Sequence, residues 1–156
     1  MVLAQLRERL WGRVVIAGVG NTLRGDDGFG PLMIQRLRGK VKAALFDCGS
    51  APENFLGPIR RLNPDTILVL DAADFSADPG EVRVFDSSQW QGGGFSTHHL
   101  SLNLFADLLM ADTSARIYLV AVKPKTIGFD QPMSPEVREG CRKLHRWLLS
   151  LLDQSN

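Results

Sequence analysis

The chain has 156 residues, of which 44% are hydrophobic and 22% charged, with a formal net charge of +1 and two cysteines. This composition fits one globular domain over residues 1–156, gives no basis for nucleic-acid binding, and offers neither a disulfide framework nor a cysteine metal motif. No apolar run approaches the roughly 20 residues of a membrane span, and the N-terminus lacks a signal-peptide core, so we expect a cytoplasmic protein.

The first half of the chain alternates predicted strands and helices. Arg13–Ala17 is continuously apolar after its first residue, which is typical of a strand buried on both faces of a parallel sheet. A glycine-rich loop follows, and Phe29–Leu37 then carries apolar residues at helical spacing. Lys42–Phe46 is a weaker strand. Phe55–Leu62 is a predicted helix in which Pro58 is tolerated near the first turn.

The second half continues the alternation. Thr66–Leu70 and Ile117–Val122 are again apolar strands, whereas Glu81–Phe85 alternates and indicates an edge strand with one face in water. Helices are predicted over Leu100–Met110 and after the capping residue Ser134, where proline takes the first helical position. This order predicts a three-layer α/β domain. It has a mostly parallel central sheet of about five strands, one of them an edge strand, and helices on both faces.

The glycine-rich loop carries an acidic pair, Asp26-Asp27, where many α/β proteins bind phosphate. Phosphate needs N–H groups and cations, so two carboxylates here repel anions and attract metal ions or cationic groups. The loop lacks the lysine of a P-loop, and Leu23 stands where the dinucleotide fingerprint has its third glycine. A nucleotide-binding enzyme is therefore a weaker alternative.

Further candidate ligands follow the predicted strands. Asp47 comes after the second strand and Asp71 after the third, where we expect it to be exposed in a cleft. The loop before residue 100 delivers His98 and His99. Two carboxylates and one imidazole would suit a borderline divalent metal with positions left open for substrate. As structural alternatives, either acid of the pair caps the helix, Asp47 and Asp74 hold loops, and a histidine packs in the core.

The motifs together resemble one known family. Gly18–Gly30, Asp47–Asn54, Leu70–Asp74 and Ser96–His98 are similar to the successive motifs of the nickel–iron hydrogenase maturation endopeptidases. The late loop Ile127–Ser134 is similar as well. Its sequence and the Gly-Ser-Ala-Pro-Glu-Asn string resemble the branch that serves formate-hydrogenlyase-type hydrogenase 3. The resemblance runs in order from about residue 13 to residue 150.

The resemblance implies an endopeptidase that removes the C-terminal extension of a hydrogenase large subunit precursor after nickel insertion. Its nickel-binding trio carries over to Asp27, Asp71 and His98, and the two acids would also be catalytic. His98 is chosen over His99 because it follows Thr97 in the family pattern. Some schemes group the family with aspartic peptidases. The motif residues expected to contact substrate are Asn21, Gly49, Ser50 and Gly128.

The resemblance also implies that nickel is a recognition element brought by the substrate, a nickel-loaded large subunit precursor. The free enzyme should hold no tightly bound cofactor, because three O/N ligands bind metal modestly until substrate thiolates complete the shell. Zinc or cadmium would fill the same ligands in vitro. We expect a monomer whose long loops, Ser87–Thr97 and Lys123–Met133, contact the precursor. A non-catalytic nickel chaperone or docking module is the alternative that uses the same ligands.

Overall fold

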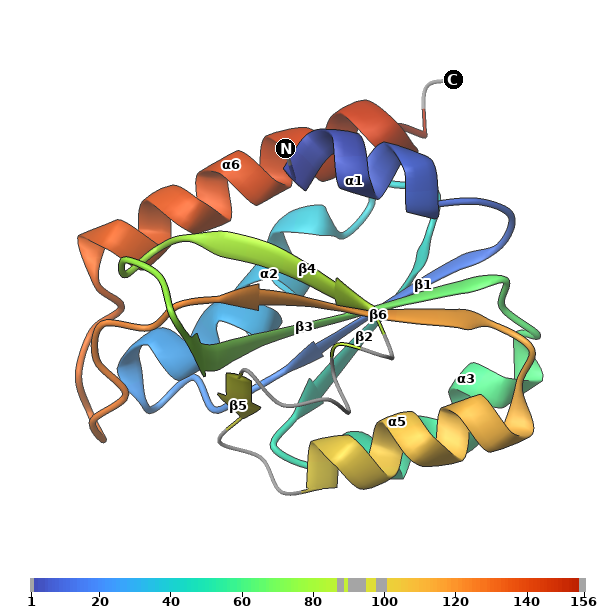
Figure 1. Ribbon diagram of the computed structural model, residues 1–156, viewed down its shortest axis with the longest axis horizontal. Coiled ribbons are helices and arrows are strands. Elements are labelled where there is room, and N and C mark those ends of the chain that lie inside the picture. Colours follow the sequence, from blue (N-terminus) through green and yellow to red (C-terminus); the bar gives the residue numbers. More distant parts are fainter. Residues whose placement is uncertain (1, 87–88, 90–94, 98–100, 155–156) are drawn as a thin grey trace.

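The computed structural model describes residues 2–86, 89, 95–97 and 101–154, which form one central sheet covered by helices on both faces (Figure 1). The strands lie in the order β2-β1-β3-β6-β4, all parallel except β4, which is antiparallel at one edge. The three-layer α/β prediction is confirmed. The strands are β1 (Val14–Val19), β2 (Ala44–Gly49), β3 (Thr66–Phe75), β4 (Val82–Asp86) and β6 (Arg116–Val122).

Strand β3 is longer than its neighbour β1. Gly18 of β1 pairs with Leu70, whereas Asp71 pairs only toward β6, opposite Ala121. Beyond that point β3 pairs with the short antiparallel strand β5 (Phe95–Thr97). The predicted end at Leu70 was therefore wrong, because β6 and β5 extend the hydrogen-bonded ladder through residues that look like turn formers in the sequence.

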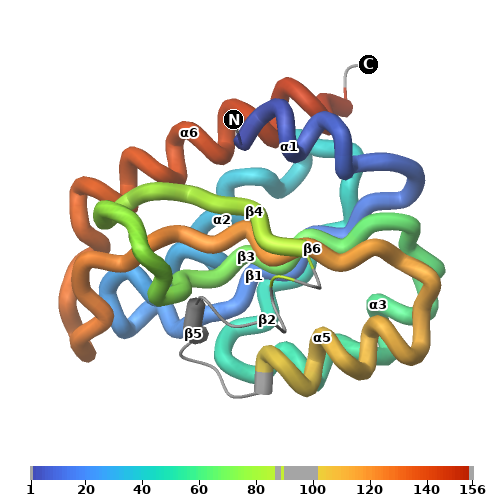
Figure 2. Tube along the Cα trace, in the orientation of Figure 1, coloured from blue at the N-terminus to red at the C-terminus, as the bar shows by residue number. Residues whose placement is uncertain are grey.

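The helices divide between the two faces of the sheet, as the tube in Figure 2 shows. Helices α1 (Val2–Arg9), α2 (Phe29–Leu37) and α6 (Pro135–Leu152) cover one face, and α3 (Leu56–Arg61) and α5 (Ser101–Asp112) cover the other. Within the described part of the chain, no helix combines the length and the apolar character needed to cross a membrane.

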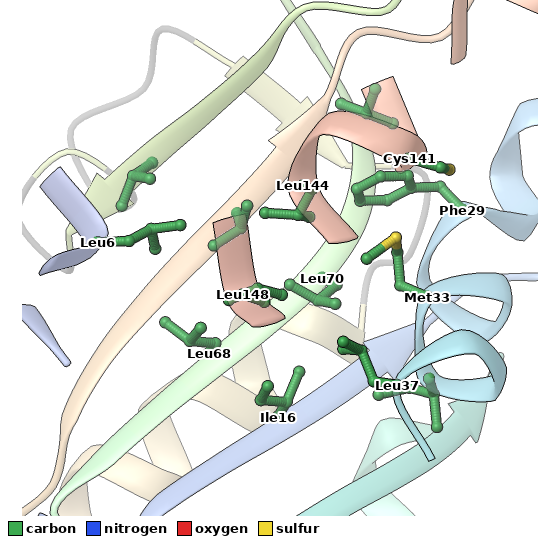
Figure 3. Packing of buried hydrophobic residues seen from close by; sticks show 14 of the residues in the cluster. Leu6, Ile16, Phe29, Met33, Leu37, Leu68, Leu70, Cys141, Leu144 and Leu148 are labelled. Carbon is green, nitrogen blue, oxygen red and sulfur yellow. The ribbon is translucent and has the colours of Figure 1, made fainter. Parts of the chain in front are cut away.

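Two apolar layers follow from the alternation of side chains along the strands. Leu68 and Leu70 of β3 contribute to the layer under α2 and α6, and Ile67 and Val69 contribute to the layer above α3 and α5. Figure 3 shows the first layer, in which side chains of α2 meet side chains of α6. The labelled residues are Leu6, Ile16, Phe29, Met33, Leu37, Leu68, Leu70, Cys141, Leu144 and Leu148.

Helix α1 was absent from the sequence prediction. It buries only Leu6 completely, and it lies against β4 with Arg9 over the ring of Tyr118, 5.7 Å from the ring centre. A short, charged helix with one buried leucine has no strong apolar period, so tertiary contacts determine it. The short strand β5 was missed for the same reason, since three residues carry too little pattern to detect.

Candidate acidic site

The acidic pair lies in a 3-10 turn, η1 (Gly25–Gly28), between β1 and α2. Two glycines allow this turn to fit directly on the sheet. A Cβ atom on Gly20 would lie 1.9 Å from the carbonyl oxygen of Asp27, and one on Gly30 would lie 2.4 Å from that of Val19. Only glycine permits such close backbone approach. The turn and the start of α2 are therefore held against the ends of β1 and β3.

Asp27 is almost completely buried, with 2% of its surface exposed. Its Oδ2 atom accepts a hydrogen bond of 2.9 Å from the backbone N–H of Asn21. The N-cap of α2 is Gly28, and no side chain caps that helix. Asp27 therefore does not have the helix-capping role considered as its structural alternative; its contact joins the turn to the glycine-rich loop.

Asp71 lies on β3, one residue beyond the point where β1 stops pairing with it. It is fully buried, which corrects the expectation of an acid exposed in a cleft: η1 packs over this end of β3. Its Oδ1 atom accepts a 2.8 Å hydrogen bond from the N–H of Ala72. Burial, and next the negative charge of Asp27, raise the pKa of Asp71 well above the usual range. The fold thus brings two of the predicted site carboxylates into one electrostatic environment.

Asp26 has a different environment from its neighbour. Its Oδ2 accepts hydrogen bonds from Lys125 N–H (2.8 Å), Thr126 N–H (3.0 Å) and the Ser134 hydroxyl (2.9 Å). Its Oδ1 accepts one from Ser134 N–H at 2.7 Å. Ser134 is also the N-cap of α6, as predicted, and accepts from Val137 N–H. Asp26 therefore fastens the loop Lys123–Met133 and the start of α6 to the acidic turn.

The predicted third ligand, His98, lies outside the described residues, and so does His99. Strand β5 ends at Thr97, which pairs with Ala73, two residues beyond Asp71 on β3. Among the residues that the structure describes, no three His, Cys, Asp or Glu side chains form a group that could hold a metal ion. The trio therefore stays a prediction.

The predicted substrate-contact residues border the glycine-rich loop. Gly49 accepts a 2.8 Å hydrogen bond from Gly20 N–H, and Asn21 is half-buried in that loop. Ser50 follows Gly49 and is exposed. Gly128 lies in the late loop, which is joined to the glycine-rich loop where Asp130 N–H donates to Leu23 at 2.7 Å. The contact of these four residues with substrate remains a prediction.

The other two acids considered have local partners. Asp47 accepts a 3.2 Å hydrogen bond from the N–H of Gly49 two residues on, which is the loop-holding role predicted for it. Asp74 is exposed and forms an ion pair with Lys123.

The backbone N–H groups of the turn are already used within the protein. Asp26 N–H donates to the Thr126 carbonyl at 2.8 Å, and Asp27 N–H donates to the Arg24 carbonyl at 3.1 Å. A phosphate loop instead directs such groups at its ligand. With two acids buried in the same turn, this geometry disfavours the nucleotide-binding alternative.

Both cysteines, Cys48 and Cys141, are buried. Burial raises the pKa of Cys48 and of Cys141 to about 12, so neither thiol ionises appreciably near neutral pH. Neither thiol is therefore suited to act as a nucleophile or a metal ligand near neutral pH.

Comparison with known proteins gives consistent matches along the chain. The sequence profile of the HycI hydrogenase maturation proteases matches residues 32–151. The chain is 34% identical over 137 residues to the hydrogenase 3 maturation protease of Escherichia coli strain K12, covering 86% of this chain and 87% of that protein. It is 30% identical over 152 residues to a putative hydrogenase maturation protease of Methanocaldococcus jannaschii, covering 91% and 89%.

The fold agrees with these matches. The structure is similar to the crystal structure of the nickel–iron hydrogenase maturation protease HycI from Thermococcus kodakarensis, with a TM-score of 0.86 and 31% sequence identity. That similarity covers 95% of this chain and 98% of the other. Sequence and fold therefore indicate the same group of proteins.

Proposed function

The chain belongs to the hydrogenase maturation protease family, and we propose that it removes the C-terminal extension of a hydrogenase large subunit precursor after nickel insertion. The observation that carries this proposal is the burial of Asp27 and Asp71 together at the ends of β1 and β3. Two buried carboxylates that repel each other are stabilised by a proton or by a cation. A divalent ion brought by the substrate would supply that charge.

Asp27 and Asp71, with His98 as the third ligand, are the groups that we propose to meet the nickel held in the precursor. Nickel would fix the position of the scissile bond relative to the two carboxylates and so serve as a recognition element. Since the nickel arrives with the substrate, the free protein needs no cofactor of its own. Zinc or cadmium would enter the same O/N ligand set.

The same carboxylates can perform the hydrolysis. In our proposal an ionised carboxylate removes a proton from water, and the water oxygen attacks the scissile carbonyl carbon. The C–N bond then breaks as the departing amine takes up a proton. The raised pKa of Asp71 favours the protonated acid in the free protein, which is the division of roles that an aspartic-type pair requires. The same oxygens would bind nickel when ionised.

The experiment is a processing assay with purified large subunit precursor, prepared with and without nickel, in which the mass of the subunit is read. We expect the wild type to shorten only the nickel-loaded form, and Asp27→Asn and Asp71→Asn to leave it intact. Asp74→Asn is the matched control, because this acid is exposed, is ion-paired with Lys123 and lies three residues from Asp71. It should process the precursor.

Two outcomes would contradict parts of this proposal. Normal processing by Asp71→Asn would remove that acid from the site. Tight binding of nickel-loaded precursor with no change of mass would instead support a nickel chaperone. His98→Gln and His99→Gln, assayed side by side, identify the imidazole that matters.

We further propose that the protein acts as a monomer in the cytoplasm, where it meets the precursor transiently.

A further inference from the structure

A groove of about 360 Å³ lies between α2, the late loop and the first turns of α6. Its walls combine apolar, amide and guanidinium groups, so it suits a ligand with both aliphatic and charged parts. The lining residues are Thr22, Gly25, Gly28, Leu32, Gln35, Arg36, Gln131, Pro132, Met133 and Arg138. Neither Asp27 nor Asp71 is among them.

Two arginines supply the charge of this groove. Arg36 extends from α2 and is half-buried, and Arg138 extends from α6 with its Nε donating a 3.3 Å hydrogen bond to the Met133 carbonyl. Among the ion pairs of the described residues, neither arginine has a partner, whereas Arg142, one turn further along α6, pairs with Glu139 at 2.8 Å. The groove therefore presents two uncompensated guanidinium groups.

The two arginines act on a common region. The thiol of Cys141 is buried between α6 and α2 (Figure 3). Burial, and to a smaller extent the charge of Asp26, raise its pKa, and the charges of Arg36, Arg142 and Arg138 lower it. The backbone of Arg36 is fixed as well, since its carbonyl lies 3.2 Å from the ring nitrogen Nε2 of His145. The two arginines therefore project from helices, α2 and α6, that pack against each other.

The groove adjoins the acidic turn. Gly25 and Gly28, which bracket Asp26 and Asp27 in η1, form part of its wall. An extended peptide advances about 3.3 Å per residue, so a few residues suffice to pass from one side of this turn to the other. A peptide placed at the carboxylates can therefore reach the groove without a long detour.

Building on the proposed function, we propose that this groove binds an acidic side chain of the precursor within a few residues of the scissile bond. Guanidinium groups bind carboxylates through paired, charge-assisted hydrogen bonds. The aliphatic part of a glutamate or aspartate would pack on Leu32 and Met133. The groove would thus add sequence specificity to the recognition of nickel.

The first test measures processing kinetics with nickel-loaded precursor. We expect Arg36→Gln and Arg138→Gln each to raise KM about tenfold while kcat stays unchanged, because the lost contact only binds substrate. Arg36→Lys and Arg138→Lys, which keep the charge, should recover part of the loss. The matched controls are Arg38→Gln and Arg142→Gln, exposed positions on or next to the same helices outside the groove, and their KM should match the wild type.

The partner residue is found by changing each acidic residue near the cleavage position of the precursor to its amide. One such change should raise KM at least tenfold, and in the Arg138→Gln background it should raise KM by a smaller factor than in the wild type, since the two changes remove a shared contact. If no acid-to-amide change raises KM, or if the arginine variants process normally, the proposal is overturned. The wild type would still cleave, so the proposed function would stand.

A peptide titration tests the groove without cleavage. The probes are the capped peptide Ac-Ala-Ala-Glu-Leu-Ala-NH₂, its glutamine counterpart, and the glutamine peptide with a free C-terminal carboxylate. In ¹⁵N NMR spectra, we expect only the glutamate peptide to shift the side-chain Nε–H signals of Arg36 and Arg138. Equal shifts from all three peptides, or none with glutamate, would overturn the proposal. Shifts with the free C-terminus alone would assign the groove to a terminal carboxylate instead.

Discussion

At the scale of single residues, Asp26 and Asp27 show that adjacent identical side chains acquire different roles. In a 3-10 turn, successive side chains point about 120° apart, so two neighbouring acids cannot face the same partners. Asp26 accepts hydrogen bonds from the N–H groups of Lys125, Thr126 and Ser134 and from the Ser134 hydroxyl. The Oδ2 atom of Asp27 instead accepts from Asn21 N–H, and its charge acts on Asp71. The first is suited to hold structure and the second to meet a ligand.

Asp71→Asn tests the protonation state of this residue. A carboxyl group whose folded pKa is raised stabilises the protein fully below its unfolded value of about 4, and this stability is lost as pH rises through the folded pKa. Asparagine cannot ionise, so we expect the variant to have a higher Tm than the wild type at pH 8 and a similar one near pH 4. Differential scanning fluorimetry measures both.

The control for this prediction is Asp78→Asn, at an exposed acid on the loop after β3. It should change Tm little at either pH. If the Tm of Asp71→Asn differs from that of the wild type by the same amount at pH 4 and at pH 8, Asp71 does not have a raised pKa.

At the scale of elements, the position of the acids depends on how closely α2 approaches the sheet. A Cβ atom on Gly30 would meet the carbonyl oxygens of Val19 and Leu70 at 2.4 and 2.5 Å, and one on Gly18 would meet that of Gly30 at 2.4 Å. The helix therefore lies directly on β1 and β3, and it carries the turn with Asp27 at its N-terminus.

Gly30→Ala would force α2 away from the strands, because the clashing atoms belong to the backbone and cannot rotate aside. We expect the free energy of unfolding to fall by about 1–3 kcal/mol, with a parallel loss of processing. Gly57→Ala in α3 is the control: apart from the adjacent residues, its nearest neighbour is the flexible end of Arg61 at 3.5 Å. The gain in helix propensity and the crowding against Pro58 oppose each other, so stability should change by less than about 1 kcal/mol. Urea denaturation measures both, and equal effects would contradict the argument.

The central parts of the strands were predictable because continuous apolar runs such as Thr66–Leu70 need burial on both faces. Their ends were not, because partners distant in the chain decide where a ladder stops: β3 continues to Phe75 on β6 and β5. The same applies to the site. The sequence identified the acidic pair, but the difference between Asp26 and Asp27 arises from Lys125, Thr126 and Ser134, about a hundred residues away along the chain.

Nothing in the sequence indicated that Arg36 and Arg138 line a common groove. Arg36 and Arg138 lie on the polar sides of two helices, where charged residues are the rule. Only the packing of α2 against α6 makes them neighbours, and only the absence of acidic partners among the described residues distinguishes them from ordinary surface charges.

At the scale of the whole molecule, the site lies where the direction of the sheet reverses. From β1 the chain crosses to β2 on one side through α2, and then returns to β3 on the other side through α3 on the opposite face (Figure 1). Ligand sites in open α/β sheets form outside the strand ends at such a switch point. Asp27 follows β1 and Asp71 lies on β3, so the topology itself brings the two acids together.

The metal content of the free protein follows from this arrangement. We expect the purified protein to contain less than stoichiometric nickel and EDTA to leave its Tm unchanged, because ligands from the substrate are needed to complete the shell. Elemental mass spectrometry and thermal unfolding measure these quantities. Full nickel occupancy that survives chelation would contradict the proposal that the metal arrives with the precursor.

Strand β3 extends further than β1 at this end of the sheet, and Asp71 lies on the part of β3 that β1 does not pair with. The difference in length between the two strands is set by the number of residues in β1, so a protein designer could alter it without changing a functional side chain. Lengthening β1 by one pleat would pair it alongside Asp71 and fill the space that η1 now covers. The surroundings of Asp71 therefore depend partly on the residue at which β1 ends. A single side-chain substitution does not test this property.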